Sequence, residues 1–152
     1  MSVETRLAEL GLTLPAPPAA VAVFEPYVVV GDTVYTSGQI ATRDGKLVAN
    51  GVLGVDVDVA GGEQAARACA LNVLAQLNAA AGSLDRIAQL IKVTVFVASA
   101  PTFTQQPQVA NGASNLFVDV LGDAGKHARS AIGVASLPLG TPVEVEAVAV
   151  LR

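Results

Sequence analysis

The 152-residue sequence contains one cysteine, one histidine and no tryptophan, and only 14% of its residues are charged. The single cysteine, Cys69, excludes an internal disulfide and a cysteine-based metal cluster, and one histidine cannot form a metal site with other histidines. Cys69 falls on the apolar side of a predicted helix, which indicates a buried and unreactive thiol. We therefore expect no metal site.

Long apolar runs and clusters of basic residues are also missing. No stretch of about 18 uninterrupted apolar residues occurs, and no N-terminal segment joins basic residues to a long apolar run. The nine lysines and arginines are spread along a chain of net charge -4, which leaves no basic stripe for nucleic acid. We expect a soluble cytoplasmic protein that binds neither membranes nor nucleic acids.

Apolar residues make up 52% of the chain, which is too many for a disordered protein. The low charge is unusual for the surface of a small monomer, and oligomerisation would account for it. The length suits one domain with one core. We assign residues 24–152 to that domain, and residues 1–23 to an N-terminal extension with a short helix at 2–10 and a proline-rich connector.

Patterns of apolar residues and turn residues predict the order of the secondary structure. A hairpin turns at Gly31-Asp32, a second tight turn spans 43–46, and residues 50–58 are irregular. Helices are predicted from 63 to 81 and from about 105 to 121, and strands at 91–97, 129–135 and 143–151. This order predicts an α+β fold, in which two helices cover one face of a mixed sheet. A closed oligomer would cover the other face.

The last two strands carry the charged residues of most interest. Glu144 and Glu146 alternate with apolar residues and share their face with valines, so we expect that face to be covered as well. If the chain reverses near Leu137-Pro138, antiparallel pairing sets Ala131 opposite Glu144, and Arg129 opposite Glu146. All of these residues would then lie on one face of the sheet.

Two interpretations of Arg129 follow from this pairing. It could form a structural ion pair with a glutamate, because charged residues are rarely buried without a partner. It could instead bind the carboxylate of a ligand, with a glutamate close by to orient a water molecule.

Several motifs together resemble one protein family, the YjgF proteins, also called RidA or reactive intermediate deaminases. They are Thr36-Ser-Gly-Gln-Ile40, Ile91-Lys-Val-Thr-Val-Phe-Val97, Asn111 with Phe117, Ala128-Arg-Ser130, Leu137-Pro138 and Val143-Glu-Val-Glu-Ala147. The resemblance covers residues 24–152. It implies a chorismate-mutase-like fold, assembled as a homotrimeric barrel with ligand clefts between the subunits.

The resemblance also implies an activity. Deaminating members hydrolyse enamine and imine intermediates such as 2-aminoacrylate to 2-ketoacids and ammonia, without a metal or organic cofactor. By motif position, Arg129 would bind the substrate carboxylate, and Glu144 with main-chain groups of Ala131 would hold the attacking water. The remaining residues expected at the ligand site are Phe24, Ser37, Gly38, Asn111, His127 and Ser130.

Three positions depart from the family pattern. Phe24 stands where the family often has a tyrosine, Ala131 where it often has a cysteine, and His127 where many members have a proline. His127 is either a solvated loop residue or a proton carrier at the mouth of the cleft. The departures leave a second interpretation open, a non-catalytic trimer that binds small carboxylate metabolites or a protein partner. The net charge of -4 argues against a third, ribonuclease activity.

Overall fold

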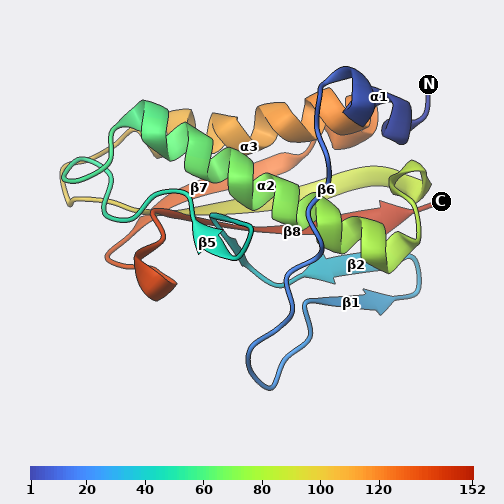
Figure 1. Ribbon diagram of the computed structural model, residues 1–152, viewed down its shortest axis with the longest axis horizontal. Coiled ribbons are helices and arrows are strands. Elements are labelled where there is room, and N and C mark those ends of the chain that lie inside the picture. Colours follow the sequence, from blue (N-terminus) through green and yellow to red (C-terminus); the bar gives the residue numbers. More distant parts are fainter.

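The computed structural model describes all residues, 1–152, and places two long helices side by side over one face of a sheet (Figure 1). In chain order the elements are α1 (Val3–Glu9), β1 (Tyr27–Val30), β2 (Thr33–Thr36), β3 (Gln39–Ile40), β4 (Thr42–Arg43), β5 (Lys46–Leu47), α2 (Val59–Ala81), η1 (Leu84–Arg86), β6 (Ile87–Ala98), α3 (Gln106–Leu121), η2 (Gly122–Gly125), β7 (Ala128–Val134), η3 (Pro138–Gly140) and β8 (Val143–Leu151). The predicted order of helices and strands is confirmed.

Local signals explain where most elements begin and end. The β1–β2 hairpin pairs Val30 with Thr33, so its turn is the predicted Gly31-Asp32. Helix α2 begins earlier than the predicted Glu63, because the Asp58 side chain accepts a hydrogen bond from the Gly61 amide and caps it. It ends at Gly82, whose positive φ of 80° suits a residue without a Cβ.

The order of the strands differs from the prediction. It is β1-β2-β8-β6-β7, and β7 runs parallel to β6 while the other pairs are antiparallel. The predicted direct pairing of the 129–135 and 143–151 strands is therefore wrong. Helix α3 returns the chain to the start of the sheet after β6, so β7 lies parallel beside β6, and β8 occupies the opposite side of β6.

The corrected strand order separates the two charged residues of interest. Arg129 lies level with Val93 of β6, and Val93 lies level with Ala147 of β8, so all three side chains are on the helix-covered face. Glu144 lies level with Phe96 and is on the opposite face. The prediction that Arg129 and Glu144 share one face is wrong for a single chain.

The core lies between the helices and the sheet. Alternate residues of β8 are buried against α2, and the other alternate residues, on the far face, are only half-buried. The helices approach each other closely at Gly112, where a Cβ would lie 2.1 Å from the Glu63 carbonyl oxygen. Cys69 is buried as predicted, and burial raises the pKa of its thiol well above the ordinary value.

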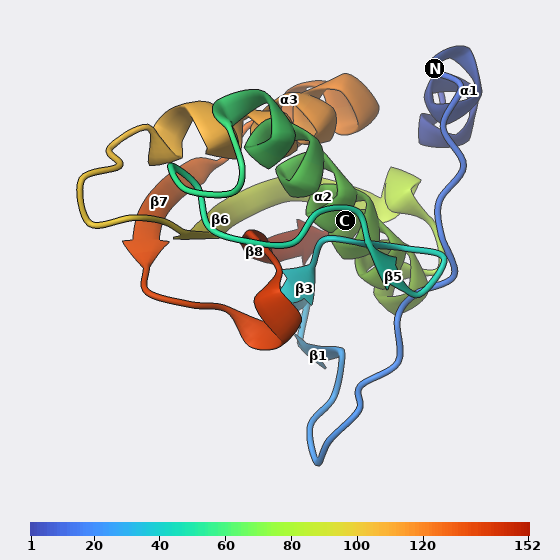
Figure 2. The ribbon, with the colours of Figure 1, turned by 60° about the vertical axis from the view of Figure 1, so that its left-hand side comes forward.

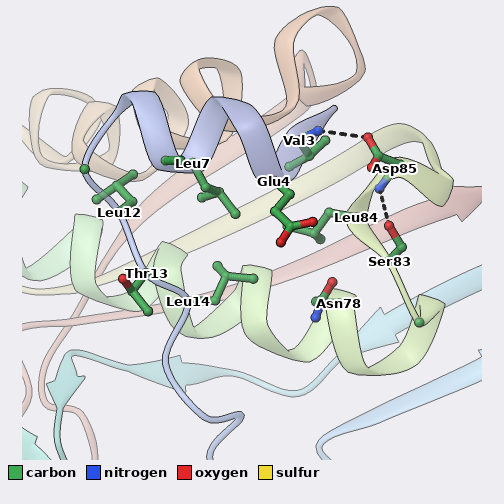
Figure 3. Close-up of a pocket in the computed structure, with 13 residues that line it drawn as sticks. Val3, Glu4, Leu7, Leu12, Thr13, Leu14, Asn78, Ser83, Leu84 and Asp85 are labelled. Carbon is green, nitrogen blue, oxygen red and sulfur yellow. Dashed lines mark hydrogen bonds between the residues drawn. The ribbon is translucent and has the colours of Figure 1, made fainter. Parts of the chain in front are cut away.

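The N-terminal segment is packed onto this core. Val3 and Leu7 of α1 are buried within it, and the Val3 amide donates to Asp85 Oδ1 at 2.9 Å (Figure 3). The Arg6 guanidinium donates to the carbonyl oxygen of Val120 at 3.2 Å. The boundary at residue 23 stays a prediction, but α1 shares the core of the rest of the chain.

The far face of the sheet is bare in one chain. Val28 and Tyr35 are 49% and 51% exposed there, and Val148 lies level with Tyr35 in the neighbouring strand. Ile132 on β7, 43% exposed, extends this apolar surface to the other edge of the sheet. None of the helices has both the length and the hydropathy needed to cross a membrane.

Candidate functional site

Arg129 lies on the edge strand β7, and its guanidinium reaches over the first turns of α3. Nη1 donates to Asn111 Oδ1 at 2.9 Å and to Ser114 Oγ at 3.2 Å, and Nη2 donates to the Pro107 carbonyl oxygen at 3.4 Å. All three acceptors are uncharged. They orient the guanidinium without neutralising it, so its positive charge remains for a ligand.

A histidine is hydrogen-bonded to one of these three acceptors, Ser114. His127 Nδ1 lies 2.6 Å from the Gly125 carbonyl oxygen, and Nε2 lies 2.9 Å from Ser114 Oγ. A carbonyl oxygen can only accept, so Nδ1 carries the proton, and in the neutral ring Nε2 accepts from the Ser114 hydroxyl. The serine oxygen then accepts from Arg129. His127 thus orients Ser114, and Ser114 orients Arg129.

His127 is half-buried and not a solvated loop residue. The edge of its ring meets the Phe117 ring, with centroids 5.8 Å apart and an interplanar angle of 87°. Burial lowers the pKa of His127 below its ordinary value; the hydrogen bond to Gly125 opposes this shift, and the charge of Arg129 adds to it. This shift favours the neutral ring, which matches its role as an acceptor.

Sequence reasoning missed the part played by Ser114, which lies within the helix predicted from about 105 to 121. A signal was present in the spacing of Asn111 and Ser114, because residues three apart on a helix lie on the same side. That spacing indicates a pair of polar groups facing one neighbour. It does not say that the neighbour is Arg129.

Glu144 lies on the other side of the sheet, next to Gly38. A Cβ at Gly38 would lie 2.4 Å from Glu144 Oε2, so any larger residue there would force this carboxylate to move. Burial raises the pKa of Glu144 above that of an ordinary carboxyl, and the charge of Glu146 raises it further. The carboxyl group can therefore exchange protons nearer to neutral pH.

A cavity of about 540 Å³ opens beside Glu144. It is bounded by the connector that precedes β1, by the segment from Gly38 to Thr42, and by the turn η3. Phe24, which is 51% exposed, lines it together with Gly38. Figure 2 shows the connector protruding beyond the sheet on the side away from the helices.

No ion pair joins Arg129 to either glutamate. The only salt bridge in the chain joins Lys126 to Asp123 at 2.9 Å, on the surface. The structural ion pair considered for Arg129 is therefore wrong for one chain. One chain holds an arginine and a half-buried glutamate on opposite faces, and neither has a partner of opposite charge.

Three other residues predicted at the site make no side-chain hydrogen bond to Arg129 or Glu144 in one chain. The Ser37 hydroxyl donates to the Glu25 carbonyl oxygen at 2.6 Å and fastens the connector to β2. Ser130 accepts from Lys92 Nζ at 2.9 Å on the bare face. Ala131 lies level with Val95 on the helix side and packs against the core. Their predicted roles at the ligand site stay predictions.

A further hollow of about 710 Å³ lies between α1 and the C-terminal end of α2 (Figure 3). Leu7, Leu14 and Leu84 form its apolar wall, and Glu4 and Asp85 at its rim are exposed to solvent. None of the predicted site residues lines it. No group of three or more histidine, cysteine, aspartate or glutamate residues lies close enough together to hold a metal ion.

Two proteins of known sequence are similar to this chain. Protein TCP17 of Trypanosoma cruzi is 46% identical over 99% of this chain and 94% of its own length. The 2-iminobutanoate/2-iminopropanoate deaminase of Rattus norvegicus is 33% identical over 88% of this chain and 83% of its own length.

Solved structures agree with the fold. Protein Atu1372 of Agrobacterium tumefaciens, of unknown function, has a TM-score of 0.90 at 46% identity, covering 99% of this chain and 92% of its own. TdcF of Escherichia coli, solved with bound serine, has a TM-score of 0.67 at 31% identity, covering 90% of this chain and 94% of its own.

A family model matches almost the whole chain. It spans residues 4–151, and its description is YjgF/chorismate mutase-like, with a suggested endoribonuclease activity. The relatives, the shared fold and this match agree with the resemblance seen in the motifs. The chain belongs to the YjgF/chorismate mutase-like family.

Proposed function

We propose that this protein hydrolyses small 2-imino acids, and the enamines that give rise to them, to 2-ketoacids and ammonia, in clefts between the subunits of a homotrimer. One observation carries the proposal: Arg129 and Glu144 each lack a partner of opposite charge. Arg129 is held by three neutral acceptors. Glu144 is half-buried beside a cavity.

The two residues cannot act on one molecule within one chain, because they lie on opposite faces of the sheet. A second copy would have to bring its Arg129 to the cavity beside Glu144. The bare face is apolar enough to drive such an association. A cleft between copies would also exclude water and strengthen the contact between the guanidinium and a carboxylate.

The reaction needs little from the protein. An enamine such as 2-aminoacrylate first tautomerises to the imine. The oxygen of water then adds to the imine carbon, and one proton of that water passes through Glu144 to the nitrogen. The hydroxyl proton of the resulting carbinolamine then passes to the nitrogen as the carbon–nitrogen bond breaks, so that the carbonyl forms and ammonia leaves. No electron is gained or lost, so no oxidant or reductant is required.

Each residue has a defined part in this scheme. Arg129 holds the carboxylate of the substrate in a charge-assisted contact. Glu144, with its raised pKa, accepts a proton from the water and returns it to the departing nitrogen. Holding both reactants in one cleft lowers the entropic part of the barrier. Two relatives support the proposal, since one bears the name of an imine deaminase and another was solved with an amino acid bound.

The test measures ammonia release from freshly generated 2-aminoacrylate by the wild-type protein, by Arg129→Ala and by Arg43→Ala. Arg43 is an exposed arginine in the β4–β5 hairpin, away from α3, and serves as the matched control. We expect Arg129→Ala to lose at least about 100-fold in kcat/KM, because a lost charged contact and poor positioning combine. Equal rates for all three proteins would end the proposal.

Phe24 favours a second candidate, a non-catalytic trimer that binds small carboxylate metabolites. Its ring lines the cavity beside Glu144 but has no hydroxyl to exchange protons. This candidate predicts saturable binding of 2-ketoacids in calorimetry, lost in Arg129→Ala, without turnover of any imino acid. RNA cleavage that persists after repurification from a nuclease-deficient host would favour the endoribonuclease activity suggested for the family instead.

A further inference from the structure

We infer that the ligand's side chain is apolar and larger than a methyl group, and that it occupies the cavity beside Glu144. This inference rests on the proposed function and names the substrate class of the same site: 2-imino acids with branched aliphatic or aromatic side chains. It depends on the composition of the cavity wall, on the cavity's size, and on the conformation of one leucine.

The wall of the cavity is apolar apart from its reactive end. Glu144 is the only charged residue among those that line it. The connector contributes Val21 and Phe24, and the opposite wall contributes Ile40 and Leu139. Gln39 also lines the cavity, but its side-chain amide donates back to the carbonyl oxygens of Ser37 and Gly38. A polar side chain on the substrate would find few partners here.

The size of the cavity exceeds what the smallest substrate needs. A volume of about 540 Å³ lies within the range of about 300–1,000 Å³ typical of sites for drug-sized ligands. The three-carbon chain of 2-aminoacrylate would leave most of this wall exposed to water. A side chain of four or more carbons would cover it and gain the free energy of apolar burial.

The conformation of Leu139 is an independent reason to infer an apolar side chain on the ligand. Its φ is 59°, a left-handed conformation that costs a branched residue energy, and its side chain is 80% exposed. Its carbonyl oxygen accepts from Asn50 Nδ2 at 3.2 Å, so the turn is held in place. An exposed leucine in a strained turn contributes nothing to folding that glycine or asparagine would not. Contact with an apolar ligand would explain why a leucine occupies this position.

The first experiment compares 2-imino acids generated in the assay from L-alanine, L-leucine and L-phenylalanine by an amino-acid oxidase, with catalase present. We expect kcat/KM about tenfold higher for the leucine-derived substrate than for the alanine-derived one, from burial of the extra carbons. Leu139→Asn should reduce this preference to about twofold. Asparagine tolerates the left-handed conformation, so the fold is kept, as circular dichroism would verify.

Val23→Asn is the matched control. Val23 belongs to the same connector and is fully exposed, but it does not line the cavity. Its substitution should leave the preference at tenfold. If Val23→Asn reduced the preference for the leucine-derived substrate as much as Leu139→Asn does, surface hydrophobicity in general, and not the cavity, would set that preference.

The second experiment measures ligand binding without chemistry, by calorimetry with the products pyruvate and 4-methyl-2-oxopentanoate. Wild type should bind the larger ketoacid about tenfold more tightly than pyruvate. Leu139→Asn should bind the two ketoacids about equally. Equal affinities in wild type, or a preference that survives Leu139→Asn, would overturn the inference. If the binding preference is present but no imino acid is turned over, the deaminase proposal fails and the ligand class stands.

Discussion

The neighbours of Arg129 hold its guanidinium without neutralising it, which leaves its charge available to the proposed ligand. Nη1 of the guanidinium donates to Asn111 and Ser114, and Nη2 donates to the Pro107 carbonyl oxygen. Ser114 owes its own orientation to His127, which is bound in turn to the Gly125 carbonyl oxygen. The histidine that departs from the family pattern is therefore a positioning residue for the arginine.

Ser114→Ala tests this chain of contacts. It removes one acceptor of Arg129, and we expect KM for the imino acid to rise about fivefold while kcat changes less than twofold, because about 1 kcal/mol of orientation is lost. Asn115→Ala, an exposed change on the same helix, is the control and should alter neither constant. A fall in kcat with KM unchanged would instead assign Ser114 to the chemical step.

Glu144 makes stability depend on pH. Its folded-state pKa is raised above the ordinary value of 4.5, so the folded protein holds the proton more tightly than the unfolded chain does. The contribution of this group to stability is therefore largest below 4.5 and is lost as pH rises through the raised value.

Glu144→Gln removes this dependence, because glutamine is never ionised. The melting temperature of Glu144→Gln should exceed that of wild type at pH 7, and the difference should shrink at pH 4. Glu9→Gln, an exposed change on α1, provides the comparison in thermal melts at both pH values. A difference between Glu144→Gln and wild type that stays constant with pH would contradict the assignment.

Helix α1 shows that an element outside the predicted domain can still belong to the core. Its inner side buries Val3 and Leu7 against the rest of the chain, and its outer side carries exposed residues. The sequence predicted a short helix here, and in the structure the Ser2 side chain caps it by accepting from the Thr5 amide. Nothing in the local sequence indicated where the helix packs.

Leu7→Ala and Leu10→Ala form a matched pair on α1. Leu7 is 9% exposed and Leu10 is 42% exposed. Loss of the buried side chain should reduce the free energy of unfolding by about 2–3 kcal/mol, and loss of the exposed one by less than about 0.5 kcal/mol. Urea denaturation measures both. Equal small losses would mean that residues 1–23 are a separable extension.

The molecule as a whole has one covered and one bare sheet face. The helices cover the first, while the second presents Val28, Tyr35 and Val148. We expect the bare faces of several copies to meet, which would also bring Arg129 of one copy toward Glu144 of another.

Val148→Glu tests this assembly. Lys92 lies level with Val148 in β6, so a glutamate there has a counter-charge and the single chain should still fold. Light scattering should show a trimer of the 15.3 kDa chain for wild type and a single chain for the variant. The variant should also lose activity. Val55→Glu, in an exposed loop, should leave mass and activity unchanged. A monomeric wild type would refute the proposed cleft.

Periodicity and turn residues were enough to predict the helices, the hairpin and the alternation of side chains along β8. Strand alternation led to Arg129 and Glu144, and the family resemblance added Gly38 and Asn111, because alternation and motif positions are local properties of the chain. These predictions needed no knowledge of which elements touch.

The neighbours of each strand depended on the folded chain. Every strand edge offers the same backbone donors and acceptors, so the sequence did not reveal that β6 separates β7 from β8. Because of this strand order, Arg129 and Glu144 lie on opposite faces of the sheet. Likewise, the contact of His127 with Ser114 joins a loop to a helix, and the cavity wall joins three distant segments. Packing in three dimensions, which local patterns do not encode, brought these groups together.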